Sequence, residues 1–231
     1  MNPHFSSIKT IVKNHAIPLT KSKQDGSPVT ELDLALSSYI EELFQRDHPE
    51  YCFYSEENFK EWRFPLLALD PLDGTREYVD GRPEWALSLG LFADDDFDGE
   101  GWVYNPVTDE RFTMETVALS QSGPKLLGEA SRTEFAKGLY RSLNDPRIDL
   151  RPRGSIAYKL GKLSSGKLDF VVSLRPKNIW DVAGGSLLCK KAGLAFYSQG
   201  QLVTKVKPSY EPPLLWCRPS EFSYLSRALS S

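Results

Sequence analysis

The sequence predicts a mixed α/β (α+β) protein built from two halves that meet near residues 120–124. Apolar runs typical of strands recur along the chain, and other segments carry apolar residues at helical spacing. No linker rich in proline or serine divides the 231 residues, a length that allows one large domain or two packed halves. We therefore expect an N-terminal half over residues 1–122 and a C-terminal half over residues 123–231.

The N-terminal half is predicted to begin with two helices and to continue as a series of strands. Apolar residues repeat at helical spacing from Leu32 to Phe44, and His48-Pro49 ends that pattern. The expected elements are a helix over 5–16, a polar loop over 20–29, a helix from Thr30 to Arg46, and strands over 51–54, 66–69, 85–92, 101–104 and 111–115.

The C-terminal half is predicted to mix strands and helices. Gly193 follows a helical run and suits a left-handed residue that ends a helix. The expected elements are strands over 125–130, 168–173, 194–197 and 214–217, and helices over 134–143, 155–164 and 181–192.

Composition and charge exclude several classes of protein. The net charge of −3 argues against a basic surface for duplex nucleic acid, and no apolar run approaches the ~20 residues of a membrane span. Residues 1–13 lack the apolar stretch and cleavage site of a signal peptide. The three cysteines form no CxxC pair, which is typical of buried or free thiols in a reducing compartment. We expect a cytoplasmic protein that binds neither a nucleic acid polymer nor a membrane.

The histidines narrow the chemistry that the chain can perform. His4, His15 and His48 all lie within the first 48 residues. The rest of the chain must therefore use carboxylates, hydroxyls, amines and backbone groups instead of imidazole.

The densest chemical signal is the segment ALDPLDGT over residues 68–75. Its apolar strand ends at Asp70, and the carboxyl ends of strands are common ligand sites in α/β proteins. Pro71 fixes the backbone and Gly74 permits a tight turn, so Asp70 and Asp73 can converge. Clustered carboxylates suit hard divalent cations, and backbone N–H groups after the turn can face an anion. An ordinary Asx turn explains the same residues. This segment alone therefore leaves open whether it is a cation site or a simple turn.

Three further carboxylates have both a functional and an ordinary interpretation. Glu56 follows a strand candidate and is either a ligand at a strand end or part of a solvated acidic loop. Asp181 lies near a helix start, where a carboxylate is favourable in any case. Thr30 and Asp33 have the spacing of a capping box, which explains Asp33 without any catalytic role.

The acidic segment over residues 94–99 matches the first half of an EF-hand loop. Asn105 occupies the twelfth position, where a bidentate glutamate is expected, and the flanking segments are strands. We interpret this segment as a solvated hairpin tip.

Taken together, five segments resemble the inositol monophosphatase-like family of metal-dependent phosphomonoesterases. They occur in the order found in that family and comprise SPVTELD (27–33), SEE (55–57), LDPLDGTREY (69–78), GSIAYKL (154–160) and IWDVAGG (179–185). The resemblance covers about residue 20 to the end, and the helical region before it is shorter than usual in the family. It implies a two-half layered αβαβα sandwich of the inositol monophosphatase/fructose-1,6-bisphosphatase type.

The resemblance also implies a magnesium site with two or three ions. Glu56, Asp70 and the carbonyl of Leu72 would bind one Mg²⁺. Asp70, Asp73 and Asp181 would bind a second, with Asp70 shared between them. Two close cations can stabilise the attacking and leaving oxygens of an in-line displacement, which agrees with a site that has no histidine.

The same resemblance implies the catalytic and substrate-binding residues. Thr75, hydrogen-bonded to Asp33, would orient the attacking water and help to deprotonate it, and Glu56 is the third catalytic residue. We expect the substrate to be held by Gly74, Thr75, Gly154, Ser155, Lys159 and Arg175.

Two features favour one substrate class. The DPLDGTREY segment resembles the form found in 3′(2′),5′-bisphosphate nucleotidases, whereas inositol monophosphatases more often show DPIDGTxNF. Two cationic side chains, Arg175 and Lys177, shortly precede Asp181. The inositol enzymes usually have a carboxylate in this segment. A second substrate phosphate would suit Arg175, Lys177 or Lys159, although solvated surface cations explain the same residues.

These features predict a Mg²⁺-dependent, lithium-sensitive enzyme, a monomer or homodimer, that converts adenosine 3′,5′-bisphosphate to AMP and phosphate. The alternatives are an inositol-1-monophosphatase, another small sugar or histidinol phosphate phosphatase, and a non-catalytic protein that binds metal or nucleotide.

Overall fold

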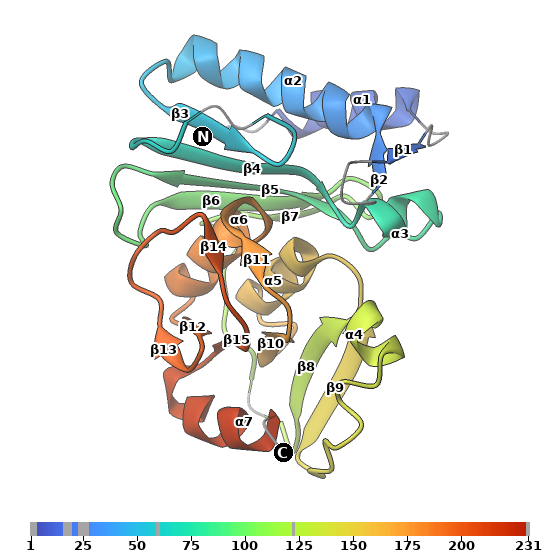
Figure 1. Ribbon diagram of the computed structural model, residues 1–231, viewed down its shortest axis with the longest axis vertical. Helices are drawn as coiled ribbons and strands as arrows, with labels where there is room; N and C mark the ends of the chain where they lie inside the picture. Colours follow the sequence, from blue (N-terminus) through green and yellow to red (C-terminus); the bar gives the residue numbers. More distant parts are fainter. Residues whose placement is uncertain (1–3, 16–19, 23–27, 59–60, 122, 230–231) are drawn as a thin grey trace.

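Two main β-sheets and three layers of helices are stacked in the order helix, sheet, helix, sheet, helix (Figure 1). The computed structural model describes residues 4–15, 20–22, 28–58, 61–121 and 123–229. This stacking confirms the predicted mixed α/β fold and its αβαβα layers. The boundary expected at residue 122 lies outside the described residues and stays a prediction.

The first sheet has five strands, in the order β3-β4-β5-β6-β7. β3 and β4 are parallel, and the other neighbouring pairs are antiparallel. The strands are β3 (Cys52–Ser55), β4 (Leu66–Asp73), β5 (Ala86–Phe92), β6 (Glu100–Asn105) and β7 (Glu110–Phe112).

The second sheet has six strands, in the order β13-β12-β15-β10-β8-β9, and mixes parallel with antiparallel pairs. The strands are β8 (Leu126–Ser131), β9 (Ile148–Arg153), β10 (Phe170–Ser173), β12 (Ala195–Ser198), β13 (Gln201–Leu202) and β15 (Leu214–Cys217). Two small ribbons pair β1 (Thr20–Ser22) with β2 (Pro28–Thr30), and β11 (Lys177–Asn178) with β14 (Ser209–Tyr210).

The helices cover both sheets, and α5 and α6 lie between them (Figure 1). They are α1 (Phe5–Asn14), α2 (Glu31–Asp47), α3 (Thr75–Val79), α4 (Arg132–Ala136), α5 (Ile156–Ser164), α6 (Ile179–Lys191) and α7 (Phe222–Leu229). Among the described ranges, none of these helices combines the length and apolarity that a bilayer crossing requires.

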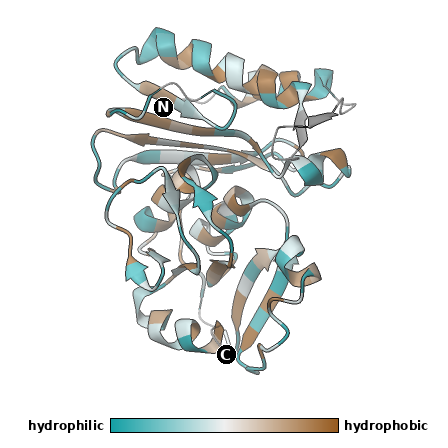
Figure 2. Ribbon diagram, viewed as in Figure 1, coloured by the Kyte–Doolittle hydropathy of each residue, from teal (hydrophilic) through white to brown (hydrophobic). Residues whose placement is uncertain are grey.

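Burial of both faces explains the apolar character of the first sheet. Leu67 and Leu69 of β4 pack in one hydrophobic cluster with α2, while Leu66 and Ala68 pack in another with α6. A strand covered on both sides is apolar along its whole length and does not alternate with polar residues. Figure 2 shows this apolar character as brown, hydrophobic ribbon along the strands between the helix layers.

Two of the predicted elements are wrong. The polar loop expected over 20–29 contains β1 and β2, although residues 23–27 lie outside the described residues. Local pattern could not reveal these three-residue strands because each depends on its partner. The helix expected over 134–143 is the five-residue α4, after which the chain turns at Gly138 with φ of 72°. The sequence pattern did not predict α3, α7, β9 or the two-residue strands β11, β13 and β14.

The three cysteines are buried and free, as predicted. Cys52 lies in the first sheet, Cys189 in α6 and Cys217 in the second sheet. Burial raises the pKa of the Cys189 and Cys217 thiols, which keeps both protonated.

The backbone of α6 packs directly on the first sheet. A Cβ added to Gly184 would lie 2.6 Å from the carbonyl oxygens of Leu89 and Trp102, and one added to Gly90 would lie 2.6 Å from Cβ of Ala183. Glycine is therefore required where the helix touches β5 and β6. This close approach fixes the start of α6, and with it Asp181, relative to the sheet.

We expect Gly184→Ala to destabilise the protein by about 1–3 kcal/mol, the usual cost of an overpacked core. Alanine favours a helix over glycine by about 1 kcal/mol. The clash outweighs this gain because both neighbouring atoms belong to the backbone and cannot rotate away. Urea unfolding of the variant and the wild type measures the difference in their free energies of unfolding.

Gly123→Ala is the matched control, because the nearest atom to an added Cβ there lies at 3.7 Å. It should change the free energy of unfolding by no more than about 0.5 kcal/mol. Equal stability of Gly184→Ala and the wild type would contradict the packing argument.

Candidate active site

A bulge at the end of β4 brings two aspartates to the same side of the sheet. A regular strand directs residues three apart to opposite faces. Asp70 pairs with Ser88 and Asp73 with Ala86, so two residues of β4 lie opposite one residue of β5. Pro71 suits this bulge because it has no N–H for the ladder. Oxygens of Asp70, Asp73 and Asp181 consequently lie within 4.8 Å of one another.

Asp181 joins this cluster from the first turn of α6. One of its carboxylate oxygens accepts a hydrogen bond from the backbone N–H of Asn178 at 3.0 Å. The two interpretations of Asp181 are therefore compatible: the side chain caps the helix and also faces Asp70 and Asp73.

Asp73 connects the first sheet to the start of α5. Its Oδ2 accepts hydrogen bonds from Ser155 Oγ and from the backbone N–H of Ala157, both at 2.6 Å. Ser155 Oγ also accepts from the backbone N–H of Tyr158 at 3.0 Å and so caps the helix. Ser155 has φ of 50°, a strained value for a residue with a side chain, and these contacts hold it there.

The cluster is electrostatically unfavourable without a cation. Asp70 is only 1% exposed, and burial together with the charges of Glu56, Asp73 and Asp181 raises its pKa well above the ordinary value. Burial is also the main reason that the pKa of Asp181 rises to about 7. A hard divalent cation would relieve this repulsion, and carboxylate oxygens are the ligands that Mg²⁺ prefers. The residues present therefore fit such an ion.

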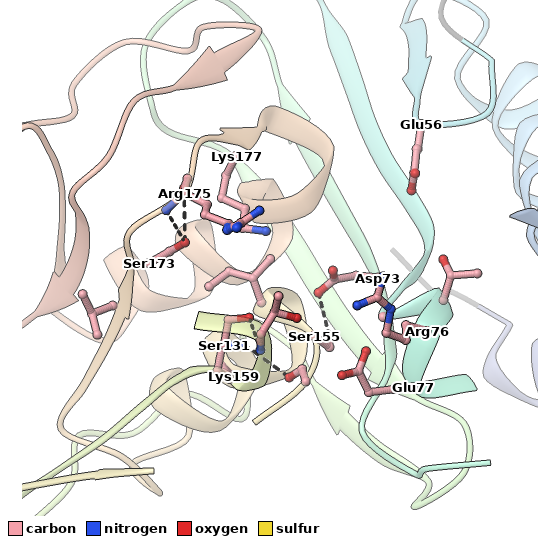
Figure 3. Close-up of a pocket in the computed structure, with 16 residues that line it drawn as sticks. Glu56, Asp73, Arg76, Glu77, Ser131, Ser155, Lys159, Ser173, Arg175 and Lys177 are labelled. Carbon is pink, nitrogen blue, oxygen red and sulfur yellow. Dashed lines mark hydrogen bonds between the residues drawn. The ribbon is translucent and has the colours of Figure 1, made fainter. Parts of the chain in front are cut away.

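The other expected ligands, Glu56 and Leu72, lie next to this cluster. The backbone N–H of Glu56 donates to the Leu69 carbonyl at 3.2 Å, which fixes the loop after β3 beside β4. Glu56 faces the same pocket as Asp73 (Figure 3), but its oxygens lie outside the group of three carboxylates within 4.8 Å. The Leu72 carbonyl accepts a hydrogen bond from Thr75 Oγ1 at 3.2 Å.

The expected hydrogen bond between Thr75 and Asp33 is not made, because Thr75 donates to the Leu72 carbonyl instead. Asp33 Oδ2 accepts from the backbone N–H and the hydroxyl of Thr30, at 2.7 and 2.5 Å, as a capping box requires. Its other oxygen, Oδ1, is buried without a partner. Burial raises the pKa of Asp33 to about 6.

A pocket of about 340 Å³ lies beside the carboxylates and gathers all six expected substrate-binding residues: Gly74, Thr75, Gly154, Ser155, Lys159 and Arg175. Sequence reasoning missed five polar residues that also line it: Arg76, Glu77, Ser131, Thr133 and Ser173. Ser131 and Ser173 are the last residues of the parallel strands β8 and β10. Polar residues at two neighbouring strand ends were a signal that could have found them.

Cations occupy the opposite wall of the pocket. Figure 3 shows Arg175 and Lys177 extending toward the space in front of Asp73. Lys159 is 2% exposed, and its Nζ donates to the carbonyls of Arg153 and Gly154 at 3.2 and 3.4 Å.

Lys159 is a buried charge and Lys177 a partly buried one. Burial lowers the pKa of Lys159 to about 8. Burial also opposes the charge of Lys177, but Asp181 and Asp73 raise its pKa overall. Neither lysine forms a salt bridge with a carboxylate in the described ranges. An anion bound in the pocket would therefore offset the cost of removing their charges from water.

The chain matches a family profile and is similar in sequence to named proteins. The profile of the inositol monophosphatase family matches residues 5–218. Inositol monophosphatase 3 of Solanum lycopersicum is 31% identical over 195 residues, which cover 71% of this chain and 71% of that protein. Nus factor SuhB of Escherichia coli K12 is 28% identical over 215 residues, which cover 79% of this chain and 77% of that protein.

Solved structures share the fold. The IMPase of Thermotoga maritima superposes with a TM-score of 0.82 at 21% identity, over 97% of this chain and 92% of that chain. An IMPase/NADP phosphatase complexed with Mg²⁺ and phosphate superposes with a TM-score of 0.77 at 14% identity, over 98% and 92% of the two chains.

We expect Asp70→Asn to abolish the stabilisation of the protein by Mg²⁺. A cation that binds only the folded state stabilises it by about 2.7 kcal/mol at a hundred times its Kd. Without divalent cations the variant should unfold at the same or a higher temperature than the wild type, because one of the repelling charges is gone. Thermal unfolding in EDTA and in Mg²⁺ measures both effects.

Asp94→Asn provides the control, because Asp94, Asp95 and Asp96 form the other carboxylate cluster of the described chain and are exposed. This variant should keep the full effect of Mg²⁺. A full Mg²⁺ effect in Asp70→Asn would show that the cation binds elsewhere.

Proposed function

Because the chain belongs to the inositol monophosphatase family and is a metal-dependent phosphatase, we propose that it acts as a 3′(2′),5′-bisphosphate nucleotidase. Its preferred substrate in this proposal is adenosine 3′,5′-bisphosphate, which yields AMP and phosphate. The observation that carries the proposal is a pair of lysines, Lys159 buried and Lys177 partly buried, that line the same pocket as Asp73 and Glu56.

We assign the metal ligands as the resemblance implies. Glu56, Asp70 and the Leu72 carbonyl would hold one Mg²⁺, and Asp70, Asp73 and Asp181 a second, in a site for two or three ions. When bound, the cations supply charge stabilisation for the attacking and leaving oxygens of an in-line displacement. The structure solved with Mg²⁺ and phosphate supports the choice of ion.

Thr75 and Asp33 are assigned to the attacking water. In this proposal the Thr75 hydroxyl exchanges its bond to the Leu72 carbonyl for one to Asp33 Oδ1, which is buried and unpartnered. The threonine then orients the water and passes a proton toward the carboxylate. Glu56 contributes negative charge on the same side of the pocket.

The transferred phosphate is assigned to the turn after β4 and the start of α5. Gly74 has φ of 99°, and a Cβ there would lie 3.1 Å from Cβ of Trp85 and 3.3 Å from Cβ of Ser155. Glycine therefore lets the turn approach Ser155 closely. Backbone N–H groups of Gly74 and Thr75 would hold the phosphate, with Gly154 and Ser155 on the other side.

The second phosphate is assigned to Lys159, Lys177 and Arg175. The two lysines pay a desolvation cost that no carboxylate of the described chain offsets by a salt bridge, and a dianion between them would offset it. Arg175 is exposed and lies at the mouth of the pocket, where it can reach a larger ligand.

Inositol 1-phosphate is the second candidate substrate, because the tomato relative is named for that activity. Lithium inhibition, a cytoplasmic location and a monomeric or homodimeric state remain part of the proposal. The free thiols support a reducing compartment.

We expect wild-type enzyme to hydrolyse adenosine 3′,5′-bisphosphate with a higher kcat/KM than inositol 1-phosphate. Lys177→Met and Arg175→Ala should each raise KM for the bisphosphate about tenfold to a hundredfold, the value of one charge-assisted contact. Turnover of inositol 1-phosphate should change little. An assay of phosphate release measures kcat and KM for the wild type and both variants on each substrate.

Lys191→Met is the control, because Lys191 is an exposed residue at the end of α6 and does not line the pocket. It should leave both KM values unchanged. If the wild type prefers inositol 1-phosphate, the nucleotidase proposal fails and the phosphatase activity stands.

We expect Thr75→Ala and Asp33→Asn to lower kcat by similar factors, with no further loss in the double variant. Two groups that act as a unit give non-additive losses. If Asp33 acted only as a helix cap, its replacement would cost about 1 kcal/mol of stability and leave the rate of the folded enzyme unchanged. Steady-state kinetics and urea unfolding of the three variants separate these roles. An Asp33→Asn variant that loses stability but keeps the wild-type rate would show that Asp33 is only a cap, and additive rate losses would show that the two residues do not act as a unit.

A further inference from the structure

A network of buried and partly buried charges connects the second sheet to the first beside the pocket. Glu84 lies just before β5, and its side chain is 13% exposed. It accepts hydrogen bonds from Arg132, the first residue of α4, and from Arg153, the last residue of β9, the latter at 2.8 Å. Burial opposes the charge of Glu84, but the two arginines hold its pKa below the ordinary value.

The network extends deeper through Arg153. Its Nε donates to Oε1 of Glu129 at 3.0 Å, and Lys162 of α5 binds the same oxygen. Glu129 is 2% exposed. The guanidinium of Arg153 therefore joins two buried carboxylates, a geometry that its planar fork fits and a lysine would not.

Two arginines of this network are direct sequence neighbours of residues that line the pocket. Arg132 stands between Ser131 and Thr133, and Arg153 directly precedes Gly154. The backbone N–H of Gly154 lies 3.5 Å from Oε2 of Glu84.

The backbone of Glu84 also lies near the opposite side of the pocket. Its backbone carbonyl lies 3.3 Å from the position of a Cβ on Gly74, in the turn that follows Asp73. The backbone of Glu84 thus lies beside the turn that follows Asp73, and its side chain binds Arg132 and Arg153 of the far wall.

We propose that Glu84 is a positioning residue that sets the separation between the carboxylates and the wall formed by Ser131, Thr133 and Gly154. The inference rests on the phosphatase activity of the site and holds whichever ester is the substrate. A displacement of about 1 Å between bound groups can cost a hundredfold in rate. The effect should therefore fall on substrate binding and turnover, while the cation cluster, which is built from other segments, stays intact.

The test is Glu84→Gln, which keeps the size of the side chain and removes its charge. We expect kcat/KM for the hydrolysed ester to fall about tenfold to a hundredfold. The inhibition constant of inorganic phosphate should rise, and Mn²⁺ affinity, measured by electron paramagnetic resonance, should stay within twofold of the wild type. Arg132→Met should give a similar loss, and the double variant should lose no more than either single variant.

Lys167→Gln is the matched control. Lys167 binds Glu110 of β7 at 2.6 Å and so also connects the region after α5 to the first sheet, but neither residue lines the pocket. This variant should change the free energy of unfolding by no more than about 1 kcal/mol and leave KM and phosphate inhibition unchanged.

Three results would overturn the proposal: an unchanged KM and phosphate inhibition in Glu84→Gln, a parallel loss of Mn²⁺ affinity, or the same kinetic defect in Lys167→Gln. If Glu84→Gln does not fold, Arg132→Met carries the test alone with the same readouts. A wild-type enzyme that hydrolyses neither ester would refute the assigned substrates only, because phosphate and Mn²⁺ binding still report on Glu84.

Discussion

The close contact between α6 and the first sheet is the constraint on which the site depends. Gly184 brings the helix backbone against the carbonyls of β5 and β6, and Gly90 makes room for Ala183. The start of the helix then reaches the bulged end of β4, where Asp181 meets Asp70. A thicker side chain at this contact would separate carboxylates that come from segments more than a hundred residues apart.

Charge is arranged in the pocket as two opposed walls. Glu56 and Asp73 line one side, with Asp70 and Asp181 clustered behind Asp73, and Lys159 and Lys177 line the other side. Burying like charges together costs stability, and within the described chain neither lysine is neutralised by a salt bridge. A bound cation would compensate the carboxylates, and a bound phosphate ester would compensate the lysines. Binding both together would therefore offset this cost.

Most of the first sheet and the carboxylates of the site could be predicted from the sequence, because buried strands and the DPLDGT turn have strong local signals. The hydrogen bond of Thr75 could not, since its choice between the Leu72 carbonyl and Asp33 depends on side-chain rotation. The short ribbon of β1 and β2 was also missed, because its strands are stabilised by pairing and not by their own composition. Glu84 gave no signal at all: its partners lie 48 and 69 residues away.

The burial of the cysteines gives the molecule an internal set of reporters. Cys52, Cys189 and Cys217 are each no more than 8% exposed, and they belong to three successive layers, the first sheet, the central helices and the second sheet. A thiol reagent can reach each sulfur only when the surrounding layer opens, so labelling kinetics record local unfolding layer by layer. The order in which the three thiols react therefore reads out which layer of the sandwich separates first.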